Sequence, residues 1–403
     1  MRYLIIGGGP AGLSAAATLR RIEEKSRVTI LAKEKFPPYA RIALPYLLTG
    51  AVEEKRMFLR VPAGVEMALG EEAAEVNPEK LEVRTTSGKK LCYDRLLIAA
   101  GAAPLRPEVD GSRLPFVFTI RDIPDVRGVQ ELLKVRKTGH AVVAGAGPVG
   151  LELSDALCKL GFRITLVISS DRVFSTMLDE PSSALVEKKL AERGVEIHKR
   201  TDIVSICPSG EVFLSSGERR LCDAIIFGKG VTPTLNFLTG SGINIRHGVP
   251  VDEHMETNIP GIYAAGDVAE TRDIVYGESR VNALWPLAFE QGMVAAYNMA
   301  SRPLAYEGSY SRNVLRVFDT SICTAGMARA EAPEVRSEGG PGFHHKIVLD
   351  HGILKGFIFV GEVRNEGLYN SLLRRKVDVT HCAGSLLHGS YDYSQAMRKC
   401  TRS

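Results

Sequence analysis

The chain has few features that would place it in a metal-binding or disulfide-bonded class. Its seven cysteines stand singly at positions 92, 158, 207, 222, 323, 382 and 400. No two of them have the C-x-x-C spacing typical of a metal site or a redox disulfide. We therefore expect no metal site, and free, mostly buried thiols of the kind found in a reducing cytosol.

Long apolar runs are also missing. We find no uninterrupted apolar stretch of membrane-spanning length. A glycine-rich motif begins already at Tyr3, and no leader-like pattern precedes it. With 45% hydrophobic and 24% charged residues, the composition is that of an ordinary globular protein. We therefore expect a cytoplasmic protein with no membrane association.

The sequence has little excess charge of either sign. The formal net charge is +4, and residues 310–403 account for it, with thirteen Lys and Arg against nine Asp and Glu. Arg374, Arg375 and Lys376 adjoin in this region. No nucleic-acid-binding motif accompanies them, so we expect no nucleic acid partner. A solvated face and a docking patch for an acidic protein would both give this pattern.

Two glycine-rich dinucleotide fingerprints are present, YLIIGGGPAGLSAAATL from Tyr3 and AVVAGAGPVGLELSDAL from Ala141. In each G-x-G-x-x-G the first glycine permits a tight turn, the second lets the backbone approach a pyrophosphate, and the third lets a helix pack on a strand. The pyrophosphate then lies on bare amides at a helix N-terminus. We therefore predict two dinucleotide sites, whose turn residues are Gly7, Gly9, Pro10, Ala11 and Gly12 in the first and Gly145, Gly147, Pro148, Val149 and Gly150 in the second.

The spacing of the motifs predicts an α/β protein with two Rossmann-like domains. The apolar strands LLIAAGAAP at 96–104 and IIFGKGVTP at 225–233 end the first and second regions in the same way. The helical pattern NALWPLAFEQGMVAAYNMA needs a partner sheet, and the first region is the natural one. We therefore expect the first domain at 1–110 and 234–308, interrupted by the second at 111–233. A small α+β domain should follow at 309–403.

These motifs carry a family resemblance. The chain resembles the pyridine nucleotide-disulfide oxidoreductase superfamily of two-dinucleotide flavoproteins, most closely its rubredoxin reductases and the flavin domains of NADH-dependent nitrite reductases. Besides the fingerprints, the resemblance rests on PPYARIALPYLL at 37–48, LLIAAGAAP, IPGIYAAGDVA at 259–269 and FVGEVRNEG at 359–367. It implies FAD in the first domain, NAD(H) or NADP(H) in the second, and a C-terminal interface domain through which a homodimer would form.

The expected FAD contacts come from several segments. The strand VTILAKE ends in Glu34, a carboxylate suited to the adenosine ribose, with Lys33 beside it. The alternative for Glu34 is a surface acid in a turn. The resemblance places Arg41 over the FAD and Asp267 at the ribityl hydroxyls. Further expected cofactor contacts are Ala100, Gly101, Gly230, Gly266 and Trp285.

The resemblance also implies a helix around 289–299 with its N-terminus at the flavin pyrimidine edge, where a positive dipole end favours reduced, anionic flavin. Simple packing at the helix entrance is the alternative explanation for Trp285 and Pro286.

The nicotinamide nucleotide is less well defined by the sequence. An acid is expected about 20 residues beyond the second set of glycines, to accept from the ribose 2′-hydroxyl. Ile168 stands there, followed by Ser169 and Ser170. These hydroxyls and Arg172 would suit a 2′-phosphate, but NADH-using relatives also often carry an arginine at that position. Both NADH and NADPH therefore stay open.

Two catalytic candidates follow from the resemblance. Glu152 matches the glutamate that the family places near the nicotinamide and flavin N5, where desolvation would raise its pKa. A glutamate on the helix surface is the alternative. Tyr46 replaces a lysine that some relatives place near the flavin. Ile42 stands at the position where the peroxidase, oxidase and coenzyme A disulfide branches carry a redox cysteine.

A flavin without an internal thiol partner must deliver its electrons outward. We therefore predict an FAD-dependent NAD(P)H oxidoreductase that lacks a redox-active cysteine and exchanges electrons with an iron-sulfur protein such as ferredoxin or rubredoxin. Two alternatives stay open. One is an NAD(P)H oxidase that reduces oxygen. The other is an FAD-bearing electron-transfer or sensor subunit whose nicotinamide site has decayed, which the missing acid at Ile168 motivates.

Overall fold

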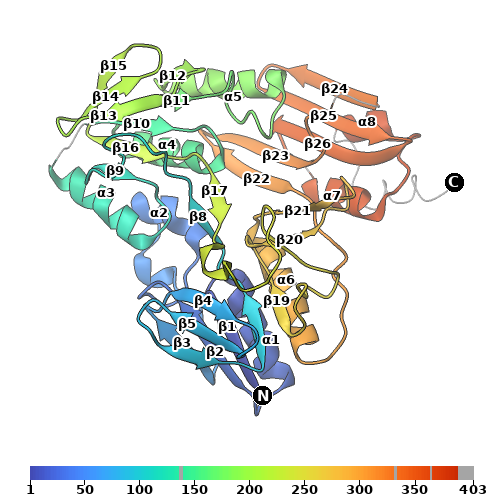
Figure 1. Ribbon diagram of the computed structural model, residues 1–403. Helices are drawn as coiled ribbons and strands as arrows, with labels where there is room; N and C mark the ends of the chain where they lie inside the picture. Colours follow the sequence, from blue (N-terminus) through green and yellow to red (C-terminus); the bar gives the residue numbers. More distant parts are fainter. Residues whose placement is uncertain (136–138, 331–333, 364, 389–403) are drawn as a thin grey trace. The chain divides into compact units, whose positions relative to one another are not determined.

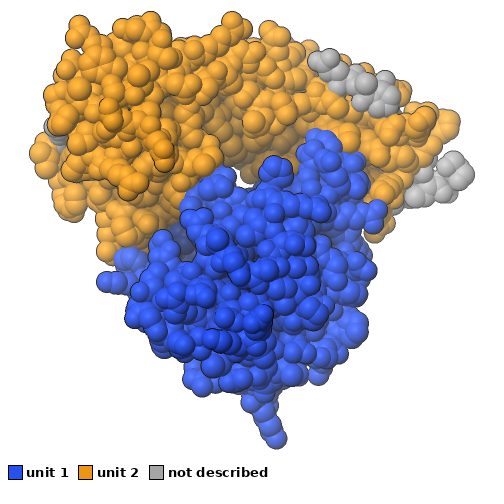
Figure 2. Space-filling model, in the orientation of Figure 1, with its two compact units in different colours: residues 1–41, 54–103, 231–310 blue, residues 42–53, 104–230, 311–403 orange. Residues whose placement is uncertain are grey.

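The computed structural model describes residues 1–135, 139–330, 334–363 and 365–388 (Figure 1). Its internal contacts divide the chain into two compact units (Figure 2). The first contains residues 1–41, 54–103 and 231–310, and the second contains residues 42–53, 104–230 and 311–403. Each unit holds one of the two glycine-rich fingerprints.

The first unit is built on a five-stranded parallel sheet in the order β19-β7-β1-β2-β3. Its strands are short apolar runs that are mostly buried, as expected for a parallel sheet covered on both faces. The strands are β1 (Arg2–Ile6), β2 (Arg27–Ala32), β3 (Val65–Leu69), β7 (Arg95–Ile98) and β19 (Ile262–Ala264). The central strand β1 pairs in parallel with both neighbours, so that Ile5 lies opposite Ile30 and Leu97.

Two helices of the first unit pack closely on each other. Helix α1 (Pro10–Ile22) follows β1, and α6 (Trp285–Met299) crosses it. A Cβ atom on Gly292 would lie only 2.1 Å from the carbonyl oxygen of Ala11, so this close approach requires glycine. Helix α6 begins at Trp285 rather than Phe289, because Pro286 fits the first turn of a helix, where its missing N–H costs nothing.

Short strands complete the first unit. They form one antiparallel sheet of β4 (Ala73–Asn77), β5 (Glu82–Thr85) and β6 (Lys90–Cys92), and a second sheet of β18 (Val249–Pro250), β20 (Ala269–Arg272) and β21 (Ser279–Arg280). Strands β8 (Ala102–Pro104) and β17 (Val231–Pro233) pair with each other where the chain leaves this unit and returns to it.

The second unit repeats the parallel arrangement, with strand order β12-β11-β10-β16-β9. These strands are β9 (Val117–Phe118), β10 (His140–Ala144), β11 (Arg163–Ile168), β12 (Glu196–Lys199) and β16 (Ala224–Phe227). The helices that accompany the sheet are α2 (Leu44–Leu48), α3 (Ile123–Val135), α4 (Pro148–Lys159) and α5 (Glu180–Glu192). A separate antiparallel sheet consists of β13 (Ile203–Ile206), β14 (Glu211–Leu214) and β15 (Arg219–Leu221).

The C-terminal part of the second unit is an antiparallel sheet in the order β22-β23-β26-β25-β24. Its strands are β22 (Arg312–Val317), β23 (Thr320–Gly326), β24 (Glu334–Gly340), β25 (Phe343–Asp350) and β26 (Ile353–Gly361), followed by α7 (Glu366–Arg375) and α8 (Ala383–Leu387). The rings of Phe357, Phe359 and Tyr369 contact one another in the core between β26 and α7. Helix α5 packs against β25 and β26 of this sheet.

The predicted fold class is confirmed, since both fingerprints lie at the turn from a parallel strand to a helix. The finer division into three domains stays a prediction. Within the part of the chain that the structure describes, no helix has the length and apolar character needed to cross a membrane. Four residues counted in the sequence analysis, Arg398, Lys399, Cys400 and Arg402, lie outside the described residues.

Candidate functional site

The first fingerprint forms a glycine turn with uncovered backbone. Gly7 has a φ of +113°, and a Cβ there would lie 2.0 Å from the carbonyl oxygen of Ala99. A Cβ on Gly12 would lie 2.0 Å from the Gly7 carbonyl oxygen. Gly9 caps helix α1 without any side-chain hydrogen bond, and no atom lies within 4 Å of its Cβ position. The start of α1 therefore has no side-chain cap and an open Cβ position at Gly9, which fits the pyrophosphate of a dinucleotide.

The second fingerprint reproduces this geometry. Gly145 has a φ of +114°, and its Cβ would lie 2.3 Å from the Gly228 carbonyl oxygen. A Cβ on Gly150 would lie 2.0 Å from the Gly145 carbonyl oxygen, while Gly147 again has open space around its Cβ position. Helix α4 begins at Pro148 with no side-chain cap. The second turn therefore fits a pyrophosphate as well as the first.

Two predicted FAD contacts, Glu34 and Arg41, lie together at the end of β2. The Arg41 guanidinium forms an ion pair with the Glu34 carboxylate. Tyr39 joins them, because its hydroxyl donates to Glu34 Oε2 at 2.6 Å and accepts from Arg41 Nη1 at 3.1 Å. The guanidinium carbon also lies 5.1 Å from the centre of the Tyr39 ring. Tyr39 therefore orients both side chains, a role that the sequence did not reveal.

Lys33, the neighbour of Glu34, has a different partner. Its ammonium forms an ion pair with Glu72 at 2.8 Å, and its side chain is 72% exposed. The structure therefore places the Lys33 ammonium in a surface ion pair, apart from the contacts that join Glu34 and Arg41. Its role in binding FAD stays a prediction.

The Gly266–Asp267 turn follows β19 and is fixed by α6. Gly266 has a φ of +82°, and its amide donates to Gln291 Oε1 at 2.8 Å. Gln291 is only 2% exposed, and its Nε2 faces the hydroxyls of Thr271 and Tyr306. The sequence analysis missed Gln291, because its neighbour Glu290 is also polar and the sequence does not show which of the two is buried. It places the turn that carries the half-buried Asp267.

The other expected cofactor contacts occupy turns and a helix start. Ala100 and Gly101 follow β7, and Gly101 has a φ of +69°. Gly230 precedes β17 with a φ of +94°. Trp285 is the first residue of α6, whose start carries no side-chain cap. Their contacts with a cofactor stay predictions.

The two catalytic candidates belong to the second unit. Glu152 is partly buried in α4, and desolvation raises the pKa of its carboxyl group. Tyr46 lies on α2 and is 59% exposed, and Ile42 nearby in the chain is 65% exposed. A carboxyl group with a raised pKa is consistent with a role beside a hydride-transfer centre. Both catalytic assignments stay predictions.

The cysteines of the described chain are free thiols. Three of them, Cys222, Cys323 and Cys382, are buried, whereas Cys92 is exposed and the other two are intermediate. Burial, with a smaller contribution from Asp155, raises the pKa of Cys158 to about 11. Burial also raises the pKa of Cys323 to about 12. Among the described residues, no group of three or more His, Cys, Asp and Glu could hold a metal ion.

The end of β11 shows an arrangement that the sequence did not reveal. Ser169 donates a hydrogen bond to Asp202 Oδ1 at 2.9 Å, and Lys229 Nζ lies 2.7 Å from the Ser169 hydroxyl and 2.5 Å from the same Asp202 oxygen. Sequence reasoning missed Asp202 and Lys229 because they follow other strands, β12 and β16.

The two bare glycine turns, each on its own parallel sheet, define the chain as a two-dinucleotide protein. A model of the pyridine nucleotide-disulphide oxidoreductase family matches residues 1–292. The chain belongs to this family. As its members and the reductases related to it use FAD and NAD(P)H, the chain is an NAD(P)H-dependent flavin oxidoreductase.

Individual relatives differ in what their names say they act on. The chain is 28% identical over 345 residues to the NAD(P)H coenzyme A polysulfide/persulfide reductase of Pyrococcus horikoshii, covering 82% of this chain and 77% of that protein. It is 28% identical over 393 residues to subunit epsilon of the NADH-dependent phenylglyoxylate dehydrogenase of Aromatoleum evansii, covering 94% and 93%. It is 30% identical over 287 residues to the rubredoxin-NAD(+) reductase of Pseudomonas putida, covering 69% and 74%.

Solved structures share the fold from end to end. Putidaredoxin reductase, in its covalent complex with putidaredoxin, superimposes with a TM-score of 0.91 at 20% identity, covering 100% of this chain and 99% of that one.

Proposed function

We propose that this oxidoreductase transfers electrons between NAD(P)H and an iron-sulfur protein of the ferredoxin or rubredoxin kind, without a redox-active cysteine. The observation that carries the proposal is Ile42. It occupies the position at which the cysteine-bearing branches keep their thiol, and its apolar side chain cannot relay electrons. Cys158 and Cys323 do not offer a substitute, because their raised pKa values keep them protonated near neutral pH.

The residues of the chain supply binding and orientation. FAD, when bound, accepts a hydride from the nicotinamide and releases electrons one at a time. Backbone amides at the starts of α1 and α4 hold the two pyrophosphates, and the Glu34–Tyr39–Arg41 cluster holds the adenosine end of FAD. Asp267 accepts hydrogen bonds from the ribityl hydroxyls. Glu152, whose carboxyl pKa is raised by desolvation, positions the nicotinamide carboxamide.

The names of related proteins and the charge of residues 310–403 both support an iron-sulfur protein as the electron acceptor. The Pseudomonas putida relative is named for rubredoxin, and the structural neighbour is a complex with putidaredoxin. The net positive charge of residues 310–403 suits an acidic electron carrier. The Aromatoleum evansii relative, which matches nearly end to end, is named as a subunit of an NADH-dependent dehydrogenase. The iron-sulfur partner is therefore either a free carrier or a companion subunit.

The intact second turn argues against a decayed nicotinamide site. Gly145, Gly147 and Gly150 keep the geometry that a pyrophosphate needs, which supports a working site despite the missing acid at Ile168. We propose that the protein works in reducing surroundings as a cytoplasmic enzyme. The homodimer through the C-terminal domain stays a prediction.

The proposal is tested by comparing acceptors with the purified flavoprotein. Reduction of rubredoxin, ferredoxin, oxygen and polysulfide with coenzyme A is measured with NADH and with NADPH, before and after iodoacetamide has alkylated the accessible thiols. We expect the iron-sulfur proteins to be the fastest acceptors and alkylation to leave their reduction unchanged. Faster reduction of oxygen would show an oxidase. Faster reduction of polysulfide that alkylation abolishes would show a cysteine-dependent enzyme.

A further inference from the structure

A carboxylate that follows the neighbouring strand lies beside the end of β11. β11 ends at Ile168, where the acid that binds the adenosine ribose is expected. β12 pairs in parallel with β11, and the chain after β12 brings Asp202 to the same edge of the sheet. The Asp202 carboxylate accepts a hydrogen bond from Ser169, the residue directly after β11, at 2.9 Å.

Backbone contacts fix the place of Asp202. Thr201 N donates to the carbonyl oxygen of Ile168 at 2.9 Å, which ties this segment to the end of β11. Ser215 holds Asp202 from the other side, because its amide donates to the Asp202 carbonyl at 2.9 Å and its hydroxyl accepts from the Asp202 amide at 3.0 Å. The carboxylate is therefore presented by a fixed segment.

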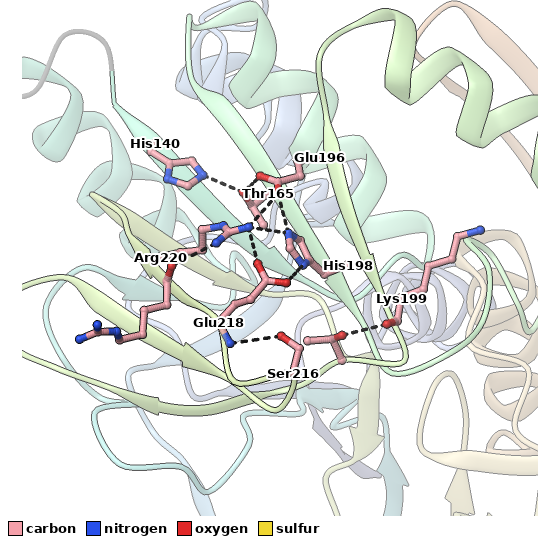
Figure 3. A network of polar contacts seen from close by, with 10 residues as sticks. His140, Thr165, Glu196, His198, Lys199, Ser216, Glu218 and Arg220 are labelled. Atoms are coloured by element: carbon pink, nitrogen blue, oxygen red, sulfur yellow. Dashed lines mark hydrogen bonds and ion pairs between the residues drawn. The ribbon is translucent and has the colours of Figure 1, made fainter.

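A polar network supports the strand that leads to Asp202 (Figure 3). Arg220 of β15 forms an ion pair with Glu196 of β12 at 2.8 Å, and His198 lies 2.8 Å from the same carboxylate. His140 of β10 contacts the Thr165 hydroxyl of β11 at 2.8 Å. These contacts join β10 to β11 and β12 to β15, and they lie at the start of β12, at the opposite end of that strand from Asp202.

Lys229 links this carboxylate to the pyrophosphate turn. It lies between Gly228 and Gly230, shortly after β16. A Cβ on Gly145 of the pyrophosphate turn would clash with the Gly228 carbonyl, so the two segments are in close contact. The Lys229 side chain is only 20% exposed, and its ammonium contacts both Ser169 and Asp202. Desolvation opposes ionisation of Asp202, but hydrogen bonds from Lys229 and Ser169 outweigh it, so the pKa of the carboxyl group is lowered. Asp202 is therefore ionised at neutral pH.

The other groups suited to a 2′-phosphate have their own partners. The Ser170 hydroxyl donates to the carbonyl oxygen of Arg172 at 2.8 Å. The Arg172 guanidinium forms an ion pair with Asp171 at 2.9 Å and faces the carbonyl of Leu178. Of the groups after β11, Ser169 is the one joined to Asp202 and Lys229.

We infer that Asp202 is the specificity-determining acid of the nicotinamide nucleotide site and makes the enzyme select NADH over NADPH. The inference rests on the proposed function, because it concerns the same nucleotide site. An ionised carboxylate accepts hydrogen bonds from ribose hydroxyls and repels a 2′-phosphate. It also neutralises Lys229, the cation that a 2′-phosphate would otherwise bind.

The test measures binding of NAD⁺ and NADP⁺ to the oxidised, FAD-loaded protein by calorimetry. We expect the wild type to bind NAD⁺ at least about tenfold more tightly than NADP⁺, and Asp202→Ala to shift the ratio of the two dissociation constants toward NADP⁺ by about 10- to 100-fold. Adding Lys229→Met to Asp202→Ala should abolish the gained NADP⁺ binding, because the free ammonium supplies it.

Glu192→Gln is the matched control, since it removes an exposed acid of α5 whose ion pair is with Lys189, outside the cluster. It should leave the ratio unchanged. An unchanged ratio in Asp202→Ala, or tighter binding of NADP⁺ than of NAD⁺ to the wild type, would overturn the inference while leaving the proposed function intact. If the wild type binds neither nucleotide, the proposed function fails and the inference fails with it.

Discussion

At the scale of single residues, the glycines of the two fingerprints perform different tasks. Gly7 and Gly12 are required by the fold, because a Cβ on either would overlap backbone atoms. Gly9 is not required by the fold, since its φ is −74° and its Cβ position is open. We propose that glycine is needed at position 9 because a bound pyrophosphate would occupy the same space.

This difference predicts opposite phenotypes for two similar substitutions. Gly9→Ala should leave the melting temperature of the apoprotein unchanged and weaken FAD binding about tenfold or more, because the methyl group stands in the way of the pyrophosphate. Gly12→Ala should destabilise the apoprotein by roughly 1–3 kcal/mol or more, because its Cβ overlaps the Gly7 carbonyl. Thermal unfolding and FAD titration of the apoproteins separate the two effects. Equal destabilisation by both would contradict this account.

Residues that belong to a motif were predictable, and residues that act across the fold were not. Glu34 and Arg41 were found one by one from strand-end and motif positions, and the structure brings them together through Tyr39. Asp202 and Lys229 lie 33 and 60 residues from Ser169 in sequence. Only the parallel order of β12, β11, β10 and β16 brings them to one edge, and no local pattern encodes that proximity.

At the scale of elements, α6 connects the two segments of the first unit that we propose to bind FAD. Gly292 allows α6 to approach the backbone of Ala11 in α1, and the adjacent Gln291 accepts from the amide of Gly266. One turn of α6 therefore sets both the glycine-rich helix and the turn that carries Asp267. The sequence predicted the helix from its apolar periodicity, but a buried glutamine was not distinguishable from an exposed one.

Gln291→Met should weaken FAD binding more than it weakens the fold. The apolar side chain leaves the Gly266 amide without its acceptor, which costs about 1–3 kcal/mol. We expect the dissociation constant of FAD to rise about 10- to 100-fold, with Asp267→Ala giving a loss of similar or larger size. Flavin content and FAD titration report the effect. A lower melting temperature of the apoprotein with unchanged FAD affinity would show that Gln291 has only a structural role.

A second set of contacts between elements joins α5 to the C-terminal sheet. The Ser182 hydroxyl of α5 lies 2.8 Å from Nδ1 of His344 on β25. Asp179 lies 3.8 Å from the same nitrogen and forms an ion pair with Lys346 at 3.5 Å. Desolvation, partly opposed by Asp179, lowers the pKa of His344. The unfolded chain therefore takes up a proton more readily than the folded one below about pH 6.5, the ordinary value for histidine. Stability contributed by neutral His344 is present above that pH and is lost as the pH falls toward the lowered pKa.

His344→Gln should therefore flatten the pH dependence of stability. Urea unfolding at intervals between pH 7.5 and 5.0 gives the free energy of unfolding of both proteins. We expect the wild type to lose more stability on acidification than His344→Gln. A steeper decline in the variant, or identical slopes, would show that this imidazole stays protonated or exposed in the folded protein.

At the scale of the whole molecule, the order of motifs along the sequence predicts the architecture well. Two fingerprints with two similar closing strands were enough to predict two Rossmann-like sheets, because strand, turn and helix must follow one another closely to hold a pyrophosphate. The division of the chain into its two compact units was harder to predict. Residues 42–53 belong to the second unit through the packing of α2 on α3 and α4, and Gln130 of α3 donates to the Leu47 carbonyl at 3.0 Å. Such long-range packing leaves no periodic signal.

In the proposed function, electrons leave this flavoprotein directly for an iron-sulfur carrier. Anaerobic stopped flow tests it most directly. The protein is reduced with one equivalent of NADH and then mixed with oxidised rubredoxin or ferredoxin, or with oxygenated buffer, while flavin absorbance is followed. We predict that an iron-sulfur protein restores the oxidised flavin spectrum at least about tenfold faster than oxygen does. Reoxidation by oxygen alone, with both iron-sulfur proteins left oxidised, would contradict the account.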